Sequence, residues 1–150
     1  MQPTTESGLV GKLVDTIVDR YREIESSQPL LNRELSGSER RALKAVSSAG
    51  RSMTISEVGA AIGTPPSTTT WIVGGLVKRG VFKRSQDKHD KRKVWIKLGQ
   101  KGEALARLLE RIPDRIAADL LYKLSPEQRS TFVELVRTAM KKIEEAGSFK

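Results

Sequence analysis

The residues of this sequence best suited to chemistry form a dense run of cations in its centre. The segment from Lys78 to Lys101 holds ten Lys and Arg residues against two Asp, in a chain whose net charge is +9. Lys and Arg neutralise phosphate groups and release the counterions condensed on a nucleic acid, so such a block is typical of a polyanion-binding surface. A surface that only aids solubility usually mixes both signs of charge. We therefore expect a nucleic acid as the partner of this segment.

The residues that enzymes use are poorly placed for catalysis. The single histidine, His89, lies inside the cationic run, which is unfavourable for a general base or a metal ligand. The chain has no cysteine, so disulfides, thiolate metal sites and thiol redox switches are excluded. No Gly-rich phosphate loop follows a predicted strand, and no carboxylates form a recognisable pair. We predict a protein that is not an enzyme and that has no metal site and no cofactor.

Length and hydropathy predict a soluble protein. A chain of 150 residues can build one domain with its own core and is short for two. Its apolar stretches all fall short of the roughly 20 residues that cross a bilayer. Residues 1–8 are polar and lack the apolar centre of a signal peptide. We therefore expect a cytoplasmic location and no membrane partner.

Three short helices with clear boundaries lead into the cationic run. Two capping boxes, in which paired side chains satisfy free backbone N–H groups, are predicted at Ser36 with Glu39 and at Thr54 with Glu57. Glycines end the three helices, at Gly50, Gly63 and Gly80. Pro65-Pro66 favours the start of the third helix at this point, because proline is tolerated in the first turn of a helix, where the N–H groups are free anyway. The second and third helices predict a helix-turn-helix, with residues 64–79 as its recognition helix.

The hydrophobic pattern changes period after the recognition helix. Residues 81–84 and 93–98 are short and β-prone, and the loop between them, residues 85–92, is polar and highly charged. Two strands around a charged tip, placed directly after a recognition helix, indicate a wing. This order of elements is far more specific than any one element alone.

Apolar helices flank the basic centre. Residues 10–24 repeat apolar side chains at three- and four-residue steps, and a second helical stretch covers residues 105–124. Pro113 is expected to kink or interrupt that stretch, and Ser125 with Pro126 predicts the start of a last helix. The predicted fold is mainly α with a small β wing, an α+β winged helix-turn-helix between terminal helices.

The predicted wing resembles that of the MarR family of transcriptional regulators in the run Asp87-Lys88-His89-Asp90-Lys91-Arg92, followed by an alternating strand and Gly102. The family wing reads Asp-x-x-Asp-Arg-Arg, then an alternating strand ending in Leu-Thr, then a glycine. Residues 76–84 are similar to the Leu-x-x-x-Gly-Leu-x-x-Arg that precedes it. Lys91 replaces an Arg and loses its bidentate fork, and Gly99 replaces a Thr that caps the next helix.

The resemblance implies a homodimer that binds DNA, most simply as a repressor. Residues 1–35 and 103–150 would supply dimerisation helices, and residues 36–102 the DNA-binding lobe, within one structural domain. A two-fold dimer places its recognition helices about one DNA turn apart, which predicts an imperfect inverted repeat as the operator. Departures from the family within the recognition helix, at Trp71, Gly74 and Gly75, mean that the sequence it reads cannot be copied from a relative.

The expected DNA contacts fall into two groups. In the recognition helix they are Ser67, Thr68, Thr70, Trp71 and Lys78. In the wing they are Lys83, Arg84, Lys88, His89, Asp90, Lys91, Arg92 and Lys93. By the resemblance, Arg92 enters the minor groove, where narrow A·T-rich DNA attracts a guanidinium, and Asp90 holds it. The other cations are expected on phosphates, which position a protein without specifying a sequence.

One alternative function and one refinement of the DNA-binding function remain open from the sequence. A winged helix can serve as a protein–protein interaction module without specific DNA binding, although such a module needs no cationic wing. Members of the resembled family bind small aromatic or lipophilic effectors between the dimer helices and the DNA-binding lobe. The candidate pocket residues here are Tyr21, Met53 and Trp71, residue types that also serve as ordinary packing.

Overall fold

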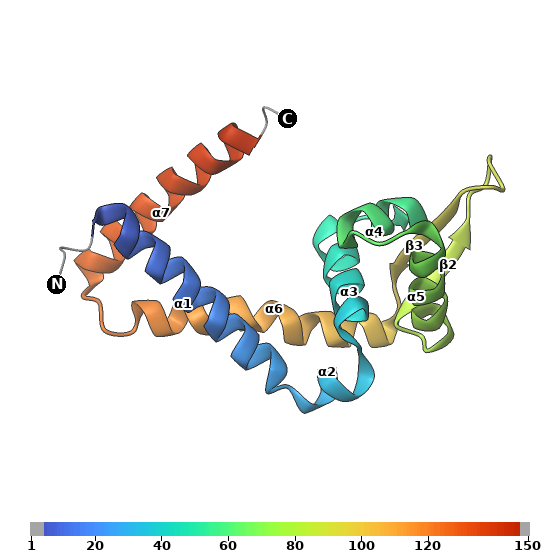
Figure 1. The fold of residues 1–150 in the computed structure, drawn as a ribbon, viewed down its shortest axis with the longest axis horizontal. Helices are drawn as coiled ribbons and strands as arrows, with labels where there is room; N and C mark the ends of the chain where they lie inside the picture. Colours follow the sequence, from blue (N-terminus) through green and yellow to red (C-terminus); the bar gives the residue numbers. More distant parts are fainter. Residues whose placement is uncertain (1–4, 148–150) are drawn as a thin grey trace. The chain divides into compact units, whose positions relative to one another are not determined.

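The computed structural model describes residues 5–147, which form helices and one small sheet (Figure 1). They divide into two compact units, one ending at Pro113 and one beginning at Asp114. This division falls inside a helix, whereas the expected functional segments meet at residues 35/36 and 102/103. The elements in chain order are α1 (Glu6–Ser26), α2 (Pro29–Glu34), α3 (Gly37–Ala49), β1 (Met53–Thr54), α4 (Ile55–Ile62), α5 (Pro66–Lys78), β2 (Phe82–Gln86), β3 (Val94–Leu98), α6 (Gln100–Leu121) and α7 (Pro126–Gly147).

The predicted helix starts are confirmed by complete capping boxes. In α3 the Ser36 hydroxyl accepts the Glu39 N–H at 3.3 Å, and the Glu39 carboxylate accepts the Ser36 N–H at 2.8 Å. Thr54 and Glu57 repeat the exchange at the start of α4, at 3.2 and 2.7 Å. The predicted stop signals also hold, because Gly50, Gly63 and Gly80 all adopt positive φ angles. Local hydrogen bonds thus set the boundaries of the helix-turn-helix.

The sheet has one more strand than the sequence pattern predicts. Its order is β1-β3-β2 with antiparallel neighbours, and Met53 pairs with Ile96. The expected wing strands are confirmed, although β2 runs on to Gln86 and so takes two residues from the predicted loop. β1 escapes prediction because two residues carry no periodic signal, and one of them also caps α4.

The core of the first unit lies between α2, α3, α4, α5, the sheet and the first part of α6. Its side chains are apolar and close to fully buried, and Phe82 at the start of β2 is the largest of them. The others include Leu31, Leu43, Val58, Val73, Leu76, Ile96, Leu105 and Ile112. Burial of these residues fixes α5 and the wing relative to the rest of this unit.

The base of the wing meets α6 through two glycines. The Gly99 N–H donates to the Val81 carbonyl at 2.8 Å. A Cβ on Gly99 would lie 2.3 Å from the Gly80 carbonyl oxygen, and one on Gly102 would lie 2.0 Å from the Val81 carbonyl oxygen. Gly99, read from the sequence as a weakened helix cap, is therefore required by close backbone approach. Glycine is required at position 102 for the same reason.

Helix α6 runs through Pro113, so the expectation of an interruption there is wrong. The proline removes one main-chain hydrogen bond, while Leu105, Leu109 and Ile112 bury the apolar stripe of the helix before it. The predicted start of α7 is confirmed. Ser125 accepts the Gln128 N–H at 3.3 Å and donates its own N–H to the Gln128 side chain at 2.9 Å.

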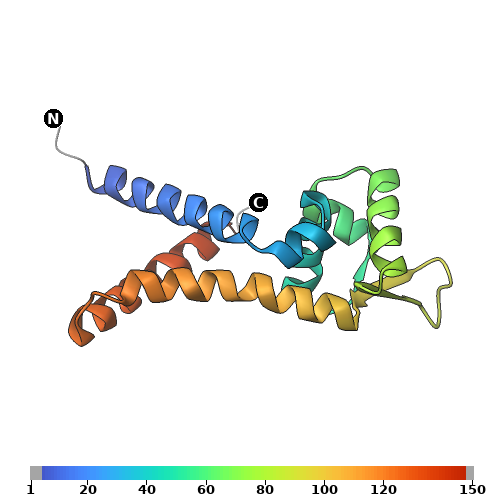
Figure 2. The ribbon, with the colours of Figure 1, turned by 90° about the horizontal axis from the view of Figure 1, so that it is seen from below.

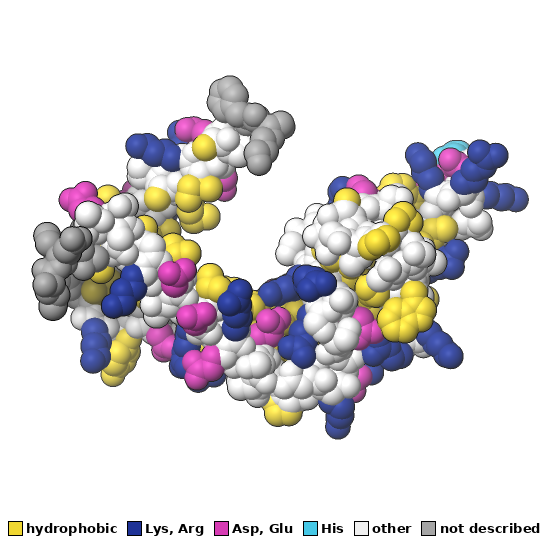
Figure 3. All heavy atoms as spheres, viewed as in Figure 1, with side chains coloured by type: hydrophobic (Ala, Val, Ile, Leu, Met, Phe, Trp, Pro, Cys, Tyr) yellow, Lys and Arg dark blue, Asp and Glu magenta, His cyan; other side chains and the backbone are white. Residues whose placement is uncertain are grey.

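Two helices expose apolar side chains that the described residues leave uncovered. On α1 these are Leu9, Val10, Leu13, Val14 and Val18. On α7 they are Val133, Leu135, Val136, Met140 and Ile143, and yellow patches follow this helix in Figure 3. Within residues 5–147, none of the helices has both the length and the apolar character for crossing a membrane.

Candidate nucleic-acid interface

Helix α5 turns one face to the core and a polar face with one large aromatic side chain to solvent. Thr69, Ile72, Val73 and Leu76 are buried. The five residues expected to contact DNA from this helix are all exposed: Ser67, Thr68, Thr70, Trp71 and Lys78. Trp71 is the extreme case, with 77% of its surface exposed. The structure thus places these five side chains together on the solvent side of α5, and their role on DNA stays a prediction.

A buried hydroxyl holds α5 against α4. The Thr69 hydroxyl lies 2.7 Å from that of Thr64 and donates to the Pro65 carbonyl at 2.9 Å. Gly59 of α4 faces it so closely that an added Cβ would lie 2.7 Å from the Thr69 oxygen. This contact sets the angle at which α5 leaves the turn. The sequence offers little signal for it, because Thr69 sits in a run of three threonines of which one alone is buried.

The β2–β3 hairpin projects beyond α5 in both ribbon views (Figure 1, Figure 2). All eight predicted wing contacts are exposed on it: Lys83, Arg84, Lys88, His89, Asp90, Lys91, Arg92 and Lys93. Figure 3 shows dark blue Lys and Arg side chains gathered around the one histidine at the tip. Residues 82–98 hold seven Lys and Arg against two Asp. The hairpin therefore presents a concentrated positive potential to solvent.

The carboxylate that organises the wing tip is Asp87. It is not among the wing residues that the sequence predicts to contact DNA. Its Oδ1 accepts the N–H groups of His89 at 2.8 Å and Asp90 at 3.0 Å. Its Oδ2 accepts the indole N–H of Trp95 at 2.8 Å. The Trp95 hydrogen bond, followed by the two main-chain bonds, lowers the pKa of Asp87 to about 2. The available signal was an Asp that begins a turn, since Asp side chains commonly bind the N–H two residues on.

Asp90 contacts the main chain of Arg92 in this structure. Its Oδ1 accepts the Arg92 N–H at 3.0 Å, and the Arg92 guanidinium has no ion pair among residues 5–147. Two further bonds close the tip, from the Gln86 side chain to the Lys91 carbonyl at 2.8 Å and between Lys93 and Asp90 at 2.9 Å. The tip is thus ordered through its backbone, which leaves the Arg92 side chain available to a ligand.

Replacing Asp87 with alanine is expected to loosen the wing tip while the helical lobe stays folded, because three hydrogen bonds converge on this one side chain. Amide hydrogen exchange at His89 and Asp90 should accelerate by about tenfold, the equivalent of one hydrogen bond. The matched control is Asp90→Ala, which removes one main-chain bond from the same turn. Equal and small effects of the two substitutions would contradict a special role for Asp87.

The wing should also respond to acid. The pKa of Asp87 lies below its ordinary value of 3.8, so its charged form is favoured in the folded state. Its contribution is therefore complete above about pH 4 and is lost as the pH falls through about 2. The Trp95 indole N–H resonance should shift over this window in an NMR titration. A shift with its midpoint well above pH 4 would show that another group controls the tip.

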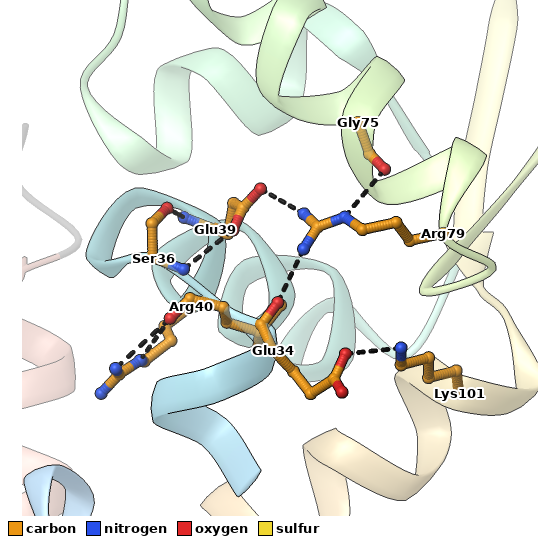
Figure 4. A network of polar contacts seen from close by, with 8 residues as sticks. Glu34, Ser36, Glu39, Arg40, Gly75, Arg79 and Lys101 are labelled. Carbon is orange, nitrogen blue, oxygen red and sulfur yellow. Dashed lines mark hydrogen bonds and ion pairs between the residues drawn. The ribbon is translucent and has the colours of Figure 1, made fainter. Parts of the chain in front are cut away.

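Arg79, at the end of α5, is held by the protein and is not free for DNA (Figure 4). Its Nη1 donates to the Glu34 carbonyl at 2.7 Å and its Nε to the Gly75 carbonyl at 3.2 Å. Its Nη2 forms an ion pair with Glu39. Lys101 pairs with the Glu34 carboxylate at 2.5 Å, and this hydrogen bond lowers the pKa of Glu34. Two cations of the basic run are thus paired with carboxylates of α2 and α3, so the unpaired positive charge concentrates on the hairpin.

The three candidate pocket residues do not come together. Tyr21 lines a pocket of about 160 Å³ with residues of α3 and α6, and the Lys44 ammonium lies 4.1 Å from its ring centroid. Met53 is buried in the core, where it pairs with Ile96 across the sheet. Trp71 is exposed on α5. A single pocket lined by all three is therefore not supported, and Tyr21 alone remains a candidate.

Comparisons with known proteins find bacterial transcriptional regulators that are similar to part of this chain. The chain matches no protein-family model. The uncharacterized HTH-type transcriptional regulator YwhA of Bacillus subtilis (strain 168) is 27% identical over 85 residues, 57% of this chain and 61% of that protein. The transcriptional regulator HosA of Escherichia coli O157:H7 is 31% identical over 83 residues, 55% of this chain and 61% of that protein. The matches thus span less than two thirds of either relative.

Solved structures extend the likeness over nearly the whole chain. The transcriptional regulator Tm0710 from Thermotoga maritima has a TM-score of 0.75 at 17% identity and covers 95% of this chain and 96% of its own. A MarR family protein from Bacillus stearothermophilus has a TM-score of 0.69 at 24% identity and covers 92% of each chain. The chain has the MarR-family fold. FabT of Streptococcus pneumoniae, solved in complex with DNA, shares this MarR-family fold with a TM-score of 0.61 at 19% identity, over 92% of this chain and 94% of its own.

Proposed function

We propose that this chain is a transcriptional regulator that binds double-stranded DNA as a homodimer and represses genes at imperfect inverted repeats. The observation that carries the proposal is the exposed face of α5 beside an ordered cationic hairpin. A helix of this size fits the major groove, and the hairpin tip suits the neighbouring minor groove. The fold shared with a DNA complex of FabT and the match to HosA support the same function.

The homodimer is supported by the uncovered apolar faces of α1 and α7. Contiguous exposed apolar surface is unfavourable in water and commonly marks an interaction site. A second copy of the chain offers the same faces, so a two-fold interface can bury them reciprocally. Such a dimer would set two α5 helices about one DNA turn apart, which is the spacing an inverted repeat needs.

The proposal is tested by selecting bound sequences from random duplex DNA and then measuring affinity across a salt series. A DNA-binding regulator should yield one enriched inverted repeat, and log K should fall linearly with log salt. The slope should be about −0.9 for each phosphate that the protein neutralises. Undetectable or salt-insensitive binding would instead indicate a winged helix that binds other proteins.

Arg92→Ala should lower affinity for the selected duplex by about 1–3 kcal/mol without changing the fold, because a guanidinium in the minor groove would be lost. Circular dichroism checks the fold and fluorescence anisotropy measures the affinity. The matched control is Arg111→Ala, which removes an exposed arginine of α6 outside the basic run. If both variants bind like the unaltered protein, Arg92 does not contact DNA in the proposed way.

We also infer that a small aromatic or lipophilic effector controls DNA binding from the pocket beside Tyr21. The pocket lies among α1, α3 and α6, and an aromatic ring and the Lys44 cation line it. An effector acts only if it binds one arrangement of the chain better than another. Compounds that raise the melting temperature should therefore also shift DNA affinity, and Tyr21→Ala should remove both effects together.

A further inference from the structure

Trp71 stands out on the proposed reading face of α5. Ser67, Trp71, Gly74 and Lys78 follow one another at three- and four-residue steps, so they share one side of the helix. The Trp71 side chain is 77% exposed, although large aromatic side chains usually gain free energy from burial. The fold of the described residues therefore gives this side chain no packing role that would explain it.

The polar face around Trp71 offers few side chains that can recognise a base through two hydrogen bonds. The Thr70 hydroxyl donates to the Pro66 carbonyl at 2.9 Å, so its hydrogen is already used within the helix. Residues 64–78 contain no Arg, Asn or Gln, and Lys78 is the one side chain there that can contact both guanine O6 and N7. Arg79 follows, and its guanidinium is bound to Glu34, Glu39 and Gly75. Recognition of a base through two hydrogen bonds from this helix thus depends on Lys78 alone, near its C-terminal end.

Gly74 leaves open space beside Trp71. A Cβ at this position would meet nothing within 4 Å, and Gly74 has no positive φ angle. Neither packing nor backbone conformation therefore requires a glycine, although glycine inside a helix costs about 1 kcal/mol relative to alanine. An opening one turn from an exposed indole allows another molecule to approach the helix backbone closely.

We infer that Trp71, with the opening at Gly74, recognises the C5-methyl groups of thymine in the major groove. This methyl group is the apolar feature that the major groove displays, and an exposed aromatic ring is well suited to bury it. The inference rests on the proposed function, because it assigns a base preference to the helix proposed to enter that groove. It makes Trp71 a specificity-determining residue and predicts a thymine-rich half-site.

The test uses one duplex selected from random DNA, prepared once with thymine and once with deoxyuridine at the half-site positions. Deoxyuridine keeps the Watson–Crick pairing and lacks only the methyl group. For the unaltered protein, affinity should fall about fourfold for each methyl group that is buried on binding. For Trp71→Ala the thymine and deoxyuridine duplexes should bind almost equally, and Trp71→Phe should keep part of the difference.

Lys78→Ala is the matched control on the same helix face. It removes a cation, so it should weaken binding to both duplexes by the same factor and reduce the salt slope by about 1. Gly74→Ala gives a second readout. It should raise the melting temperature by about 2–4 °C, because alanine favours a helix over glycine, and it should lower affinity for the thymine duplex by closing the approach.

The results separate this inference from the proposed function. If selection yields no enriched duplex, the proposed function fails, and there is then no bound sequence in which Trp71 could prefer thymine. If a duplex is enriched but deoxyuridine affects the unaltered protein and Trp71→Ala equally, methyl recognition by Trp71 is overturned while DNA binding stands. A Gly74→Ala protein that is more stable and binds DNA as tightly as before would show that the opening at Gly74 has no part in DNA recognition.

Discussion

Gly102→Ala is expected to lower the free energy of unfolding by about 1–3 kcal/mol, because its methyl group has no room. The added Cβ would lie 2.0 Å from the Val81 carbonyl oxygen, which belongs to the backbone and cannot rotate away. The start of α6 must therefore shift from the turn that begins the wing. Urea unfolding followed by circular dichroism measures the loss.

Gly37→Ala is the matched control for this substitution. Gly37 is exposed at the start of α3, and a Cβ there meets nothing within 4 Å. Its replacement should leave stability unchanged or slightly raised, since alanine favours the helix. Gly99→Ala should behave like Gly102→Ala, because its Cβ would lie 2.3 Å from the Gly80 carbonyl oxygen. Equal stabilities of Gly37→Ala and Gly102→Ala would show that the backbone adjusts without loss.

Gly102→Ala is also expected to lower the affinity for DNA. The same turn positions Val81 and Phe82 at the base of the wing, and both are buried. A shift of α6 should therefore move the hairpin relative to α5 and weaken DNA binding even where the protein remains folded. Nonspecific binding should change less than specific binding, because it depends on charge and less on the exact placement of the wing.

The elements that could be predicted from the sequence are those set by neighbouring residues. The capping boxes at Ser36 and Thr54 act within one helical turn, so their residue types reveal them directly. The wing follows from a change of hydrophobic period and a charged loop, which are also local. The exposed face of α5 was predicted because buried and exposed positions alternate at helical spacing.

Two of the features that escaped prediction depend on residues far apart in the chain. β1 exists only because Met53 meets Ile96, and Arg79 is occupied only because Glu34 and Glu39 lie beside it. Such pairings leave no periodic pattern in the sequence. For the same reason the net charge of the basic run overstated the number of free cations.

The double substitution Val136→Glu, Met140→Glu is expected to convert the proposed dimer into a monomer. It places two carboxylates on the apolar face of α7. Both side chains are exposed in the single chain, so their replacement leaves its core intact. In a dimer interface each carboxylate would be buried without a partner, at about 3–5 kcal/mol. A loss of 3 kcal/mol already raises the dimer Kd by roughly 150-fold. Sedimentation velocity measures the change of mass.

Thr131→Glu with Thr138→Glu is the matched control, because it adds the same charge to a different face of the same helix. Both threonines are exposed, and seven residues separate them, so they share a face about half a turn from that of Val136 and Met140. This control should remain a dimer and bind the inverted repeat. The monomer, by contrast, should lose cooperative binding to two half-sites while it keeps weak, salt-sensitive binding through one wing, because α5 and the hairpin lie outside the altered helix. A Val136→Glu, Met140→Glu protein that still sediments as a dimer would show that another surface joins the two copies.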